Sequence, residues 1–175
     1  MDKVNWKFDN TYSKLSESFR ELIKPIPVHN PELIIFNYQL ARDLNLDFSK
    51  LDNKELSEIF SGNNLPKETT TLAQAYAGHQ FGHFTMLGDG RAVLLGEHLD
   101  NKKNRYDIQF KGSGRTSFSR GGDGRAALGP MLREYIISES IHSLNIPTTR
   151  SLAVVKTGEK VVRENLLEGA ILTRI

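Results

Sequence analysis

The glycine residues of this chain are concentrated in its middle, and their positions restrict which secondary structure can form there. Of the fourteen glycines, eleven lie from Gly78 to Gly129, whereas residues 1–75 contain only Gly62. Glycine destabilises helix interiors and is typical of turns and of loops that approach a ligand closely. Between these glycines the residue pattern changes to a period of two, which is typical of strands. The strand candidates are HFTMLG (83–88), RAVLLGEHL (91–99) and YDIQF (106–110), and we expect them to form an antiparallel meander.

The residues before the glycine-rich region are predicted to be mainly helical. Apolar residues at helical spacing predict a helix over residues 11–23, which ends before Pro25. A short apolar run over residues 32–36 predicts one strand, and Asn37 after it is a suitable N-cap for a helix. Helices are therefore expected over the segments 37–46, 51–60 and 70–82.

The residues after the glycine-rich region predict one long helix and a second group of strands. The segment 129–146 has Pro130 in its first turn and ends before Pro147, and both positions are typical of helix boundaries. Two or three strands are expected to follow, over the segments 150–159, 160–167 and 169–175. The predicted fold class is α+β, with an antiparallel sheet, one main helix after its third strand, and a helical N-terminal segment before it.

The composition restricts the class of protein further. The 23 Lys and Arg residues nearly balance 21 Asp and Glu, so the net charge of +2 provides no global field that would attract nucleic acid. The absence of cysteine excludes disulfides and thiolate metal sites within the chain and suits a reducing compartment. The N-terminal residues lack an apolar signal segment, and no run of 18 apolar residues occurs. We therefore expect a cytoplasmic protein that makes no contact with a membrane.

A basic, glycine-rich loop directly follows the third predicted strand. Residues 111–125 read KGSGRTSFSRGGDGR and contain five glycines and four Lys or Arg residues. Alternation along the strand places Lys111 on its polar face, together with Asp107 and Gln109. Lysines on strand faces are mostly solvated, so Lys111 becomes a candidate for function only if another feature supports it.

The long helix supplies such a feature in Glu134. This residue falls at the 4-3-4-3 spacing of one helix face, and a carboxylate on an apolar face is costly unless a cation pairs with it. Lys111 is the nearest candidate partner along the chain. The alternative is a helix rotated slightly, so that Glu134 lies at the edge in water. The other members of the predicted face are Pro130, Ile137, Ile141 and Leu144.

A second glycine loop lies one strand away from the basic loop. Gly88 and Gly90 flank a turn that is followed by Arg91. Backbone N–H groups without a neighbouring Cβ can approach anionic oxygens closely, and arginine provides paired donors, so two such loops around one lysine predict an anion site. His79 and His83 have the four-residue spacing of helical metal ligands, but no third ligand is close, and we assign no metal to them.

Five segments of the chain also match the motifs of a known protein family. They are AYAGHQFGHFTMLGDGRAVLLGE (75–97), QFKGSGRTSFSRGGDGRAALG (109–129), LREYIISES (132–140), SIHSLNIPTTRSLAVV (140–155) and ILTRI (171–175). These motifs resemble those of the SelO family, also called YdiU, the kinase-like protein adenylyltransferases, over roughly residue 5 to the end. The resemblance implies a protein-kinase-like N-lobe and the transfer of AMP from ATP to Ser, Thr or Tyr hydroxyls of proteins. It also implies that ATP lies flipped relative to its position in ordinary kinases.

The same resemblance implies a set of nucleotide-binding residues and partners. The implied contacts to ATP are Gly88, Gly90 and Arg91 of LGDGRA, Lys111 of QFKGSG, Asp123 and Gly124 of GGDGR, and Arg174 of LTRI. Glu134 of LREYI resembles the ion-pair partner of the phosphate-binding lysine. The implied ligands are ATP with Mg²⁺ or Mn²⁺, and the implied partners are protein substrates with hydroxyl side chains, with no nucleic acid and no membrane.

The chain differs from the family pattern in its extent. No aspartate follows Asp123, and the resemblance places the catalytic base, the metal ligands and a second phosphate-binding arginine beyond Ile175. We therefore expect an N-terminal fragment made of a mainly helical segment (1–75) and a kinase-like N-lobe (76–175) that stops before the C-lobe. Such a fragment has no catalytic residue and no metal ligand of its own, and we expect it to be inactive alone.

Two other functional classes remain open at this point. One is a non-catalytic, pseudokinase-like module that binds a nucleotide and acts through a partner. The other is a nucleic-acid-binding protein that uses the basic residues between 102 and 125, and this class predicts an affinity that falls steeply with salt.

Overall fold

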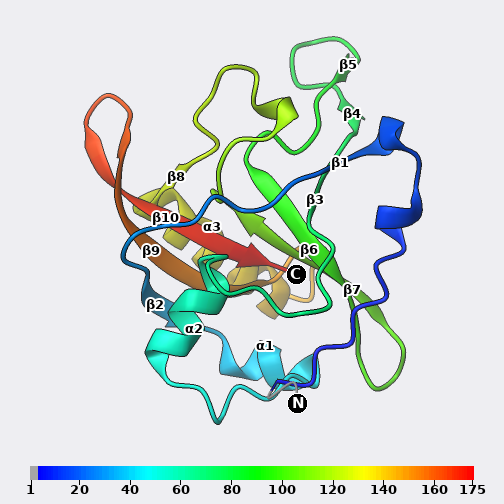
Figure 1. Ribbon diagram of the computed structural model, residues 1–175, viewed down its shortest axis with the longest axis vertical. Helices are drawn as coiled ribbons and strands as arrows, with labels where there is room; N and C mark the ends of the chain where they lie inside the picture. Colours follow the sequence, from blue (N-terminus) through cyan, green and yellow to red (C-terminus); the bar gives the residue numbers. More distant parts are fainter. Residues whose placement is uncertain (1–3) are drawn as a thin grey trace.

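The computed structural model describes residues 4–175, and within this range the strands form one eight-stranded sheet and one two-stranded sheet (Figure 1). The order across the large sheet is β1-β3-β6-β7-β10-β9-β2, with β8 paired to β10, and every pairing is antiparallel. Its strands are β1 (Arg20–Leu22), β2 (Glu32–Phe36), β3 (Leu72–Gln74), β6 (Ala92–Leu99), β7 (Arg105–Lys111), β8 (Ala126–Ala127), β9 (Ser151–Val162) and β10 (Leu166–Arg174). The small sheet pairs β4 (Ala77–Gly78) with β5 (Thr85–Met86).

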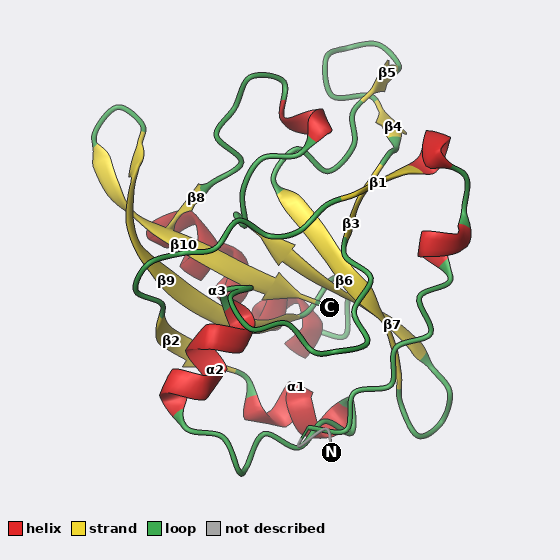
Figure 2. Ribbon diagram, in the orientation of Figure 1, coloured by secondary structure: helices red, strands yellow, loops and turns green. Residues whose placement is uncertain are grey.

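The large sheet has helices on both of its faces (Figure 2). The helix α3 (Leu128–Ser143) crosses one face, and α1 (Tyr38–Asp43) and α2 (Asn53–Phe60) pack on the other. Because side chains alternate along a strand, the central strands supply both cores. Val154 and Leu172 pack in the cluster that includes Met131 of α3, whereas Val155 and Ile171 pack with the residues of α1 and α2. The fold class is thus α+β, as predicted.

The two short helices were predicted correctly because each begins with a local signal. The side chain of Asn37 accepts a hydrogen bond from the backbone N–H of Leu40 and caps α1. Asp52 and Glu55 form a reciprocal capping box at the start of α2. Such caps satisfy backbone N–H groups that have no partner inside the helix. The strand expected over residues 32–36 is also present, as β2.

The helix expected over residues 11–23 was a wrong prediction. This segment forms two short 3-10 turns, Tyr12–Lys14 and Glu17–Phe19, and then strand β1. The apolar side chains that suggested a helix, such as Phe19, remain exposed and find no core to pack against. Instead, the buried carboxylate of Glu97 accepts hydrogen bonds from the Thr11 hydroxyl and the Tyr12 N–H, which fix the segment against β6.

The helix expected over residues 70–82 is also absent. Leu72–Gln74 forms β3, which pairs with β1 on one side and β6 on the other, and Leu72 and Ala73 are both buried. Because consecutive residues of β3 are buried, the segment shows no alternation of apolar and polar residues. Such a segment does not reveal from sequence whether it is a strand or a helix. Strands β1, β2 and β3 from the first 75 residues therefore belong to the same sheet as the later strands, and this part is less helical than predicted.

The predicted meander is correct in its second half only. Strands β6 and β7 pair along their length, as expected. The segment 83–88 forms only the short strand β5, which pairs with β4 and not with β6. The turn at Gly88–Gly90 therefore connects two different sheets, and β3 occupies the expected place beside β6.

The second half of the chain follows the prediction more closely. Helix α3 has Pro130 in its first turn, as expected, and ends before Asn145, which adopts a left-handed conformation with φ of 59°. The expected strands after it are two, β9 and β10, which form a long hairpin. Among residues 4–175, no helix has the length and apolar character needed to cross a membrane.

Candidate functional site

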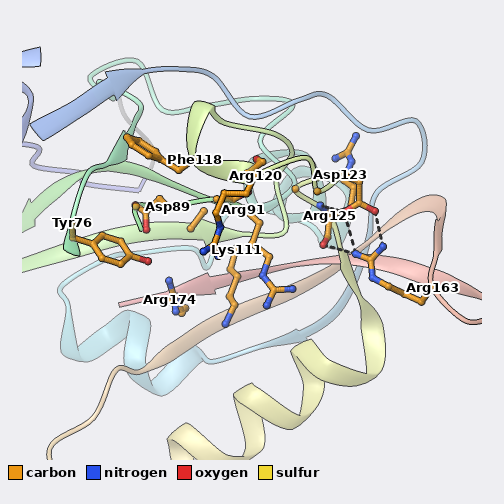
Figure 3. Close-up of a pocket in the computed structure, with 16 residues that line it drawn as sticks. Tyr76, Asp89, Arg91, Lys111, Phe118, Arg120, Asp123, Arg125, Arg163 and Arg174 are labelled. Carbon is orange, nitrogen blue, oxygen red and sulfur yellow. Dashed lines mark hydrogen bonds and ion pairs between the residues drawn. The ribbon is translucent and has the colours of Figure 1, made fainter. Parts of the chain in front are cut away.

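A pocket of about 530 Å³ opens between the two glycine-rich loops (Figure 3). It is lined by the loop between β5 and β6, the loop after β7, the ends of β7 and β10, and the turn between β9 and β10. Six of its lining residues are Arg or Lys and two are Asp. All seven residues that the family resemblance assigned to nucleotide binding line this one pocket; they are Gly88, Gly90, Arg91, Lys111, Asp123, Gly124 and Arg174. Their roles in binding stay predictions.

Lys111 and Glu134 form an ion pair at the pocket wall, as the sequence suggested. The Lys111 Nζ lies 2.5 Å from the Glu134 Oε2, and the two side chains keep 19% and 26% of their surface exposed. The predicted helix face, however, was wrong. Met131 and Ser138 are the buried residues of α3, while Ile137 is exposed. The helix is rotated relative to the prediction, and Glu134 reaches Lys111 from the edge of the interface between α3 and the sheet.

Arg174, near the end of β10, is held from two sides. Its Nη1 lies 3.5 Å from the Glu134 Oε1, and its Nη2 donates to the Gln109 side-chain oxygen. Its Nε is buried and has no acceptor among the described residues. A buried donor without a partner is costly, so the Arg174 guanidinium keeps one N–H that the described residues do not satisfy.

The two glycine loops are fixed against each other by short contacts. The Ser119 hydroxyl donates to the Gly90 carbonyl oxygen at 2.6 Å, and the Thr116 hydroxyl donates to the Asp89 carbonyl oxygen at 2.7 Å. A Cβ on Gly90 would lie 2.7 Å from the carbonyl oxygen of Phe118, which is backbone and cannot move aside as a side chain would. The absence of a side chain at Gly90 is therefore what lets the loops approach so closely.

Asp89 is a site residue that the sequence did not single out. It is only 5% exposed, and its Oδ2 accepts from the Gln74 N–H at 3.1 Å and the Gln109 Nε2 at 3.0 Å. Burial raises the pKa of this carboxyl above its ordinary value, against the lowering effect of these donors and of Arg174. An aspartate between two glycines is typical of an exposed turn, and no local sequence pattern predicts that Asp89 is buried.

At the opposite end of the pocket from Tyr76, Asp123 is paired with Arg163, which the sequence did not identify either (Figure 3). The Arg163 Nη1 donates to Asp123 Oδ2 at 2.6 Å and its Nη2 to Oδ1 at 3.1 Å. This pairing is the main cause that lowers the pKa of Asp123. Arg163 lies in the turn between β9 and β10, forty residues further along the chain, and only the hairpin brings it to the loop.

Aromatic residues line the pocket or contact one of its lining residues. Tyr76 and Phe118 line it, and the guanidinium of Arg120 stacks 5.2 Å from the ring centroid of Phe81. The helix that would have placed His79 and His83 on one face is absent here. Within the part of the chain that the structure describes, no three His, Cys, Asp or Glu residues are grouped as a metal site would need.

Comparisons with known proteins identify the family of this chain. The family model described as "Protein adenylyltransferase SelO" matches residues 2–175. Similar relatives include the protein nucleotidyltransferases YdiU of Pelagibacter ubique, which is 67% identical over 98% of this chain and 36% of the relative, and of Nitrosococcus oceani, 62% identical over 98% and 35%. The YdiU protein of Anoxybacillus flavithermus is also 62% identical, over 98% of this chain and 36% of the relative. The chain spans about a third of the length of these relatives, and by its match it belongs to the SelO family of protein adenylyltransferases.

Proposed function

We propose that this chain forms the nucleotide-binding lobe of a protein adenylyltransferase that acts on Ser, Thr or Tyr hydroxyls. The observation that carries this proposal is one pocket lined by both glycine loops, Lys111 and Arg174, in which six lining residues are Arg or Lys. A polyphosphate offers several oxygens to such donors, and the excess of basic residues around the pocket compensates its charge.

The kinase-like character of the lobe is part of the proposal. Helix α3 packs across an antiparallel sheet and supplies Glu134 to a lysine at the end of a strand, which is the arrangement of the kinase lysine and its helix glutamate. The division into a segment 1–75 and a lobe 76–175 also stays a proposal. The identity of the nucleotide as ATP and its flipped position are also part of the proposal.

The proposed reaction is a nucleotidyl transfer. A substrate hydroxyl oxygen would bond to the α-phosphorus of ATP, the bond from that phosphorus to the bridging oxygen would break, and pyrophosphate would leave while the hydroxyl proton passes to a base. Lys111 and Arg174 would neutralise charge on the phosphates, and Glu134 would hold both cations in place. Mg²⁺ or Mn²⁺, which the family resemblance implies, would accompany the phosphates. We assign no base and no metal ligand to the described residues.

Nucleotide binding tests the proposal directly. Titration calorimetry of the purified chain with ATP and magnesium should detect binding that Lys111→Met weakens at least tenfold, because the variant removes a charged phosphate partner. Lys156→Met is the matched control, since Lys156 also pairs with a glutamate, Glu32, but lies outside the pocket. An equal loss of ATP affinity in both variants, or no loss in either, would contradict the assignment of the pocket as the nucleotide site.

Two further measurements separate the other functional classes. The chain incubated with ATP labelled at the α-phosphate, magnesium and a generic acceptor protein should transfer no label, and label on the acceptor would show that the groups in this chain suffice. RNA should compete poorly with ATP, and an RNA affinity that is strong and falls steeply with salt would favour a nucleic-acid-binding protein instead.

A further inference from the structure

A chain of hydrogen bonds connects the first glycine loop to Arg174 beside the pocket, and Gln109 is its middle member. The Gln109 Nε2 donates to Asp89 Oδ2 at 3.0 Å, and its Oε1 accepts from Arg174 Nη2. From Arg174 the contacts continue to Glu134 and Lys111. Gln109 is not among the residues that line the pocket, whereas Asp89 and Arg174 both are. Gln109 can therefore affect a ligand only through these two neighbours.

The register of the sheet brings Gln109 and Arg174 together. The two residues are direct partners on the antiparallel strands β7 and β10, so their side chains leave the same face of the sheet side by side. Lys111, two residues after Gln109, projects from that same face. Figure 3 shows Asp89 and Arg174 toward the same end of the pocket, next to Tyr76.

The amide of Gln109 suits this position because it presents a donor at one atom and an acceptor at the other. It joins a carboxylate to a guanidinium without adding charge. A direct pair between Asp89 and Arg174 would occupy more of the guanidinium and compensate its charge. The neutral amide instead accepts from the Arg174 Nη2 and donates to Asp89, so it separates the two charged groups.

We propose that Gln109 is a positioning residue that fixes the Arg174 guanidinium at the pocket wall and keeps Asp89 from pairing with it directly. The ligand in this inference, the polyphosphate of a nucleotide, rests on the proposed function. The positioning itself does not, because it is a property of the protein without ligand, and the two are tested separately.

The first experiment uses the chain without nucleotide. ¹⁵N relaxation of the Arg174 Nε–H should give an order parameter near that of rigid backbone in the wild type and below about 0.6 in Gln109→Met, which keeps the side-chain length but removes both hydrogen bonds. Gln39→Met is the matched control, because Gln39 makes the same bridge between Asp43 and Arg42 on the exposed side of α1. An unchanged order parameter in a folded Gln109→Met protein overturns the positioning role.

The second experiment measures affinity for ATP with magnesium. Gln109→Met should bind about tenfold more weakly than wild type, while Gln39→Met should bind equally well. Gln109→Glu places a carboxylate that compensates Arg174, so it too should bind about tenfold more weakly at pH 8. The ratio of its affinity to that of wild type should rise toward one as the pH falls to 5.5, because protonation removes the added charge. A defect in packing alone would show no such recovery.

The groups that face the substituted carboxylate determine this recovery. Asp89 and Arg174 lie beside position 109, Glu134 pairs with Arg174 and Lys111, and Asp107 and Lys111 project from the same face of β7. Equal affinities of wild type, Gln109→Met and Gln109→Glu at all pH values overturn the inference. If the wild type binds no nucleotide but Gln109→Met still lowers the order parameter of the Arg174 Nε–H, the proposed function of the pocket is wrong and the positioning role stands.

Discussion

Replacing Glu134 by glutamine should destabilise the free protein and make its stability depend more strongly on nucleotide. Glu134 contacts Lys111 at 2.5 Å and Arg174 at 3.5 Å, so the variant leaves two cations close together with no carboxylate between them. Glutamine keeps the shape of the side chain and one oxygen acceptor. The change therefore removes charge with little loss of packing.

The magnitude follows from how far the pair is exposed. With 19% and 26% of their surfaces accessible, Lys111 and Glu134 lie between exposed ion pairs, which contribute at most about 1 kcal/mol, and buried pairs, whose disruption costs about 3–5 kcal/mol. We expect Glu134→Gln to lower the free energy of unfolding by about 1–2 kcal/mol, because glutamine retains one hydrogen bond. For a chain of this size, that loss corresponds to a decrease in Tm of roughly 3–6 °C.

Thermal unfolding with and without saturating ATP and magnesium tests this reasoning. Phosphate oxygens would supply the missing negative charge, so the nucleotide should raise the Tm of Glu134→Gln more than that of the wild type. Glu139→Gln on the same helix is the matched control: Glu139 bonds Arg150 at 2.7 Å, with 21% and 17% of the two side chains exposed, but away from the pocket. Because Glu139 also accepts from Asn37 and Ser151, this variant should lose at least as much stability and show the wild-type response to ATP. An identical ATP-induced shift in both variants would refute the reasoning.

The remaining predictions concern other parts of the molecule. In urea unfolding, Gly90→Ala should lower the free energy of unfolding by about 1–3 kcal/mol, because its Cβ would lie 2.7 Å from a backbone oxygen. Gly129→Ala in α3 is the control, since there is open space around Gly129. It should be neutral or stabilise the protein by up to about 1 kcal/mol. Burial lowers the pKa of His98 below its ordinary 6.5, so the unfolded chain binds the proton first and stability should fall as the pH drops through 6.5, by at most about 1.4 kcal/mol per pH unit. In His98→Gln, the free energy of unfolding measured between pH 7 and 5 should depend less on pH than in the wild type. An unchanged pH dependence would exclude His98 as its cause. Arg163→Met should change stability by less than about 1 kcal/mol, because its pair with Asp123 is 37% and 43% exposed, yet amide hydrogen exchange at residues 121–124 should become faster. Unchanged exchange there would mean that Arg163 does not hold the loop.

The parts of the fold that were predictable from sequence are those whose signals are local. Asn37 and Asp52 cap the helices that follow them through hydrogen bonds to residues three positions away. The strand pair β6–β7 and helix α3 also have their boundary signals nearby, in glycine and proline. The pair of Lys111 and Glu134 was one of two alternatives from the residue pattern, and the family resemblance implied it; the two residues lie on consecutive elements, which usually pack together.

Where the prediction failed, a distant partner had decided the structure. Residues 11–23 have the apolar spacing of a helix, but Glu97 and strand β3 take their hydrogen bonds. The face that α3 turns to the sheet was also misjudged, because Met131 packs on strands that come later in the chain.

Two contacts of the pocket belong to this second class. Asp89 accepts hydrogen bonds from Gln74 of β3 and Gln109 of β7, which lie on two different strands. Arg163 contacts Asp123 because the β9–β10 hairpin brings its turn to the loop. The sequence by itself determined which residue types are present and where its helices are capped. The register between β7 and β10 and the packing of the loops decided which of those residues share a site, because such contacts join residues that are far apart in the chain and leave no local pattern.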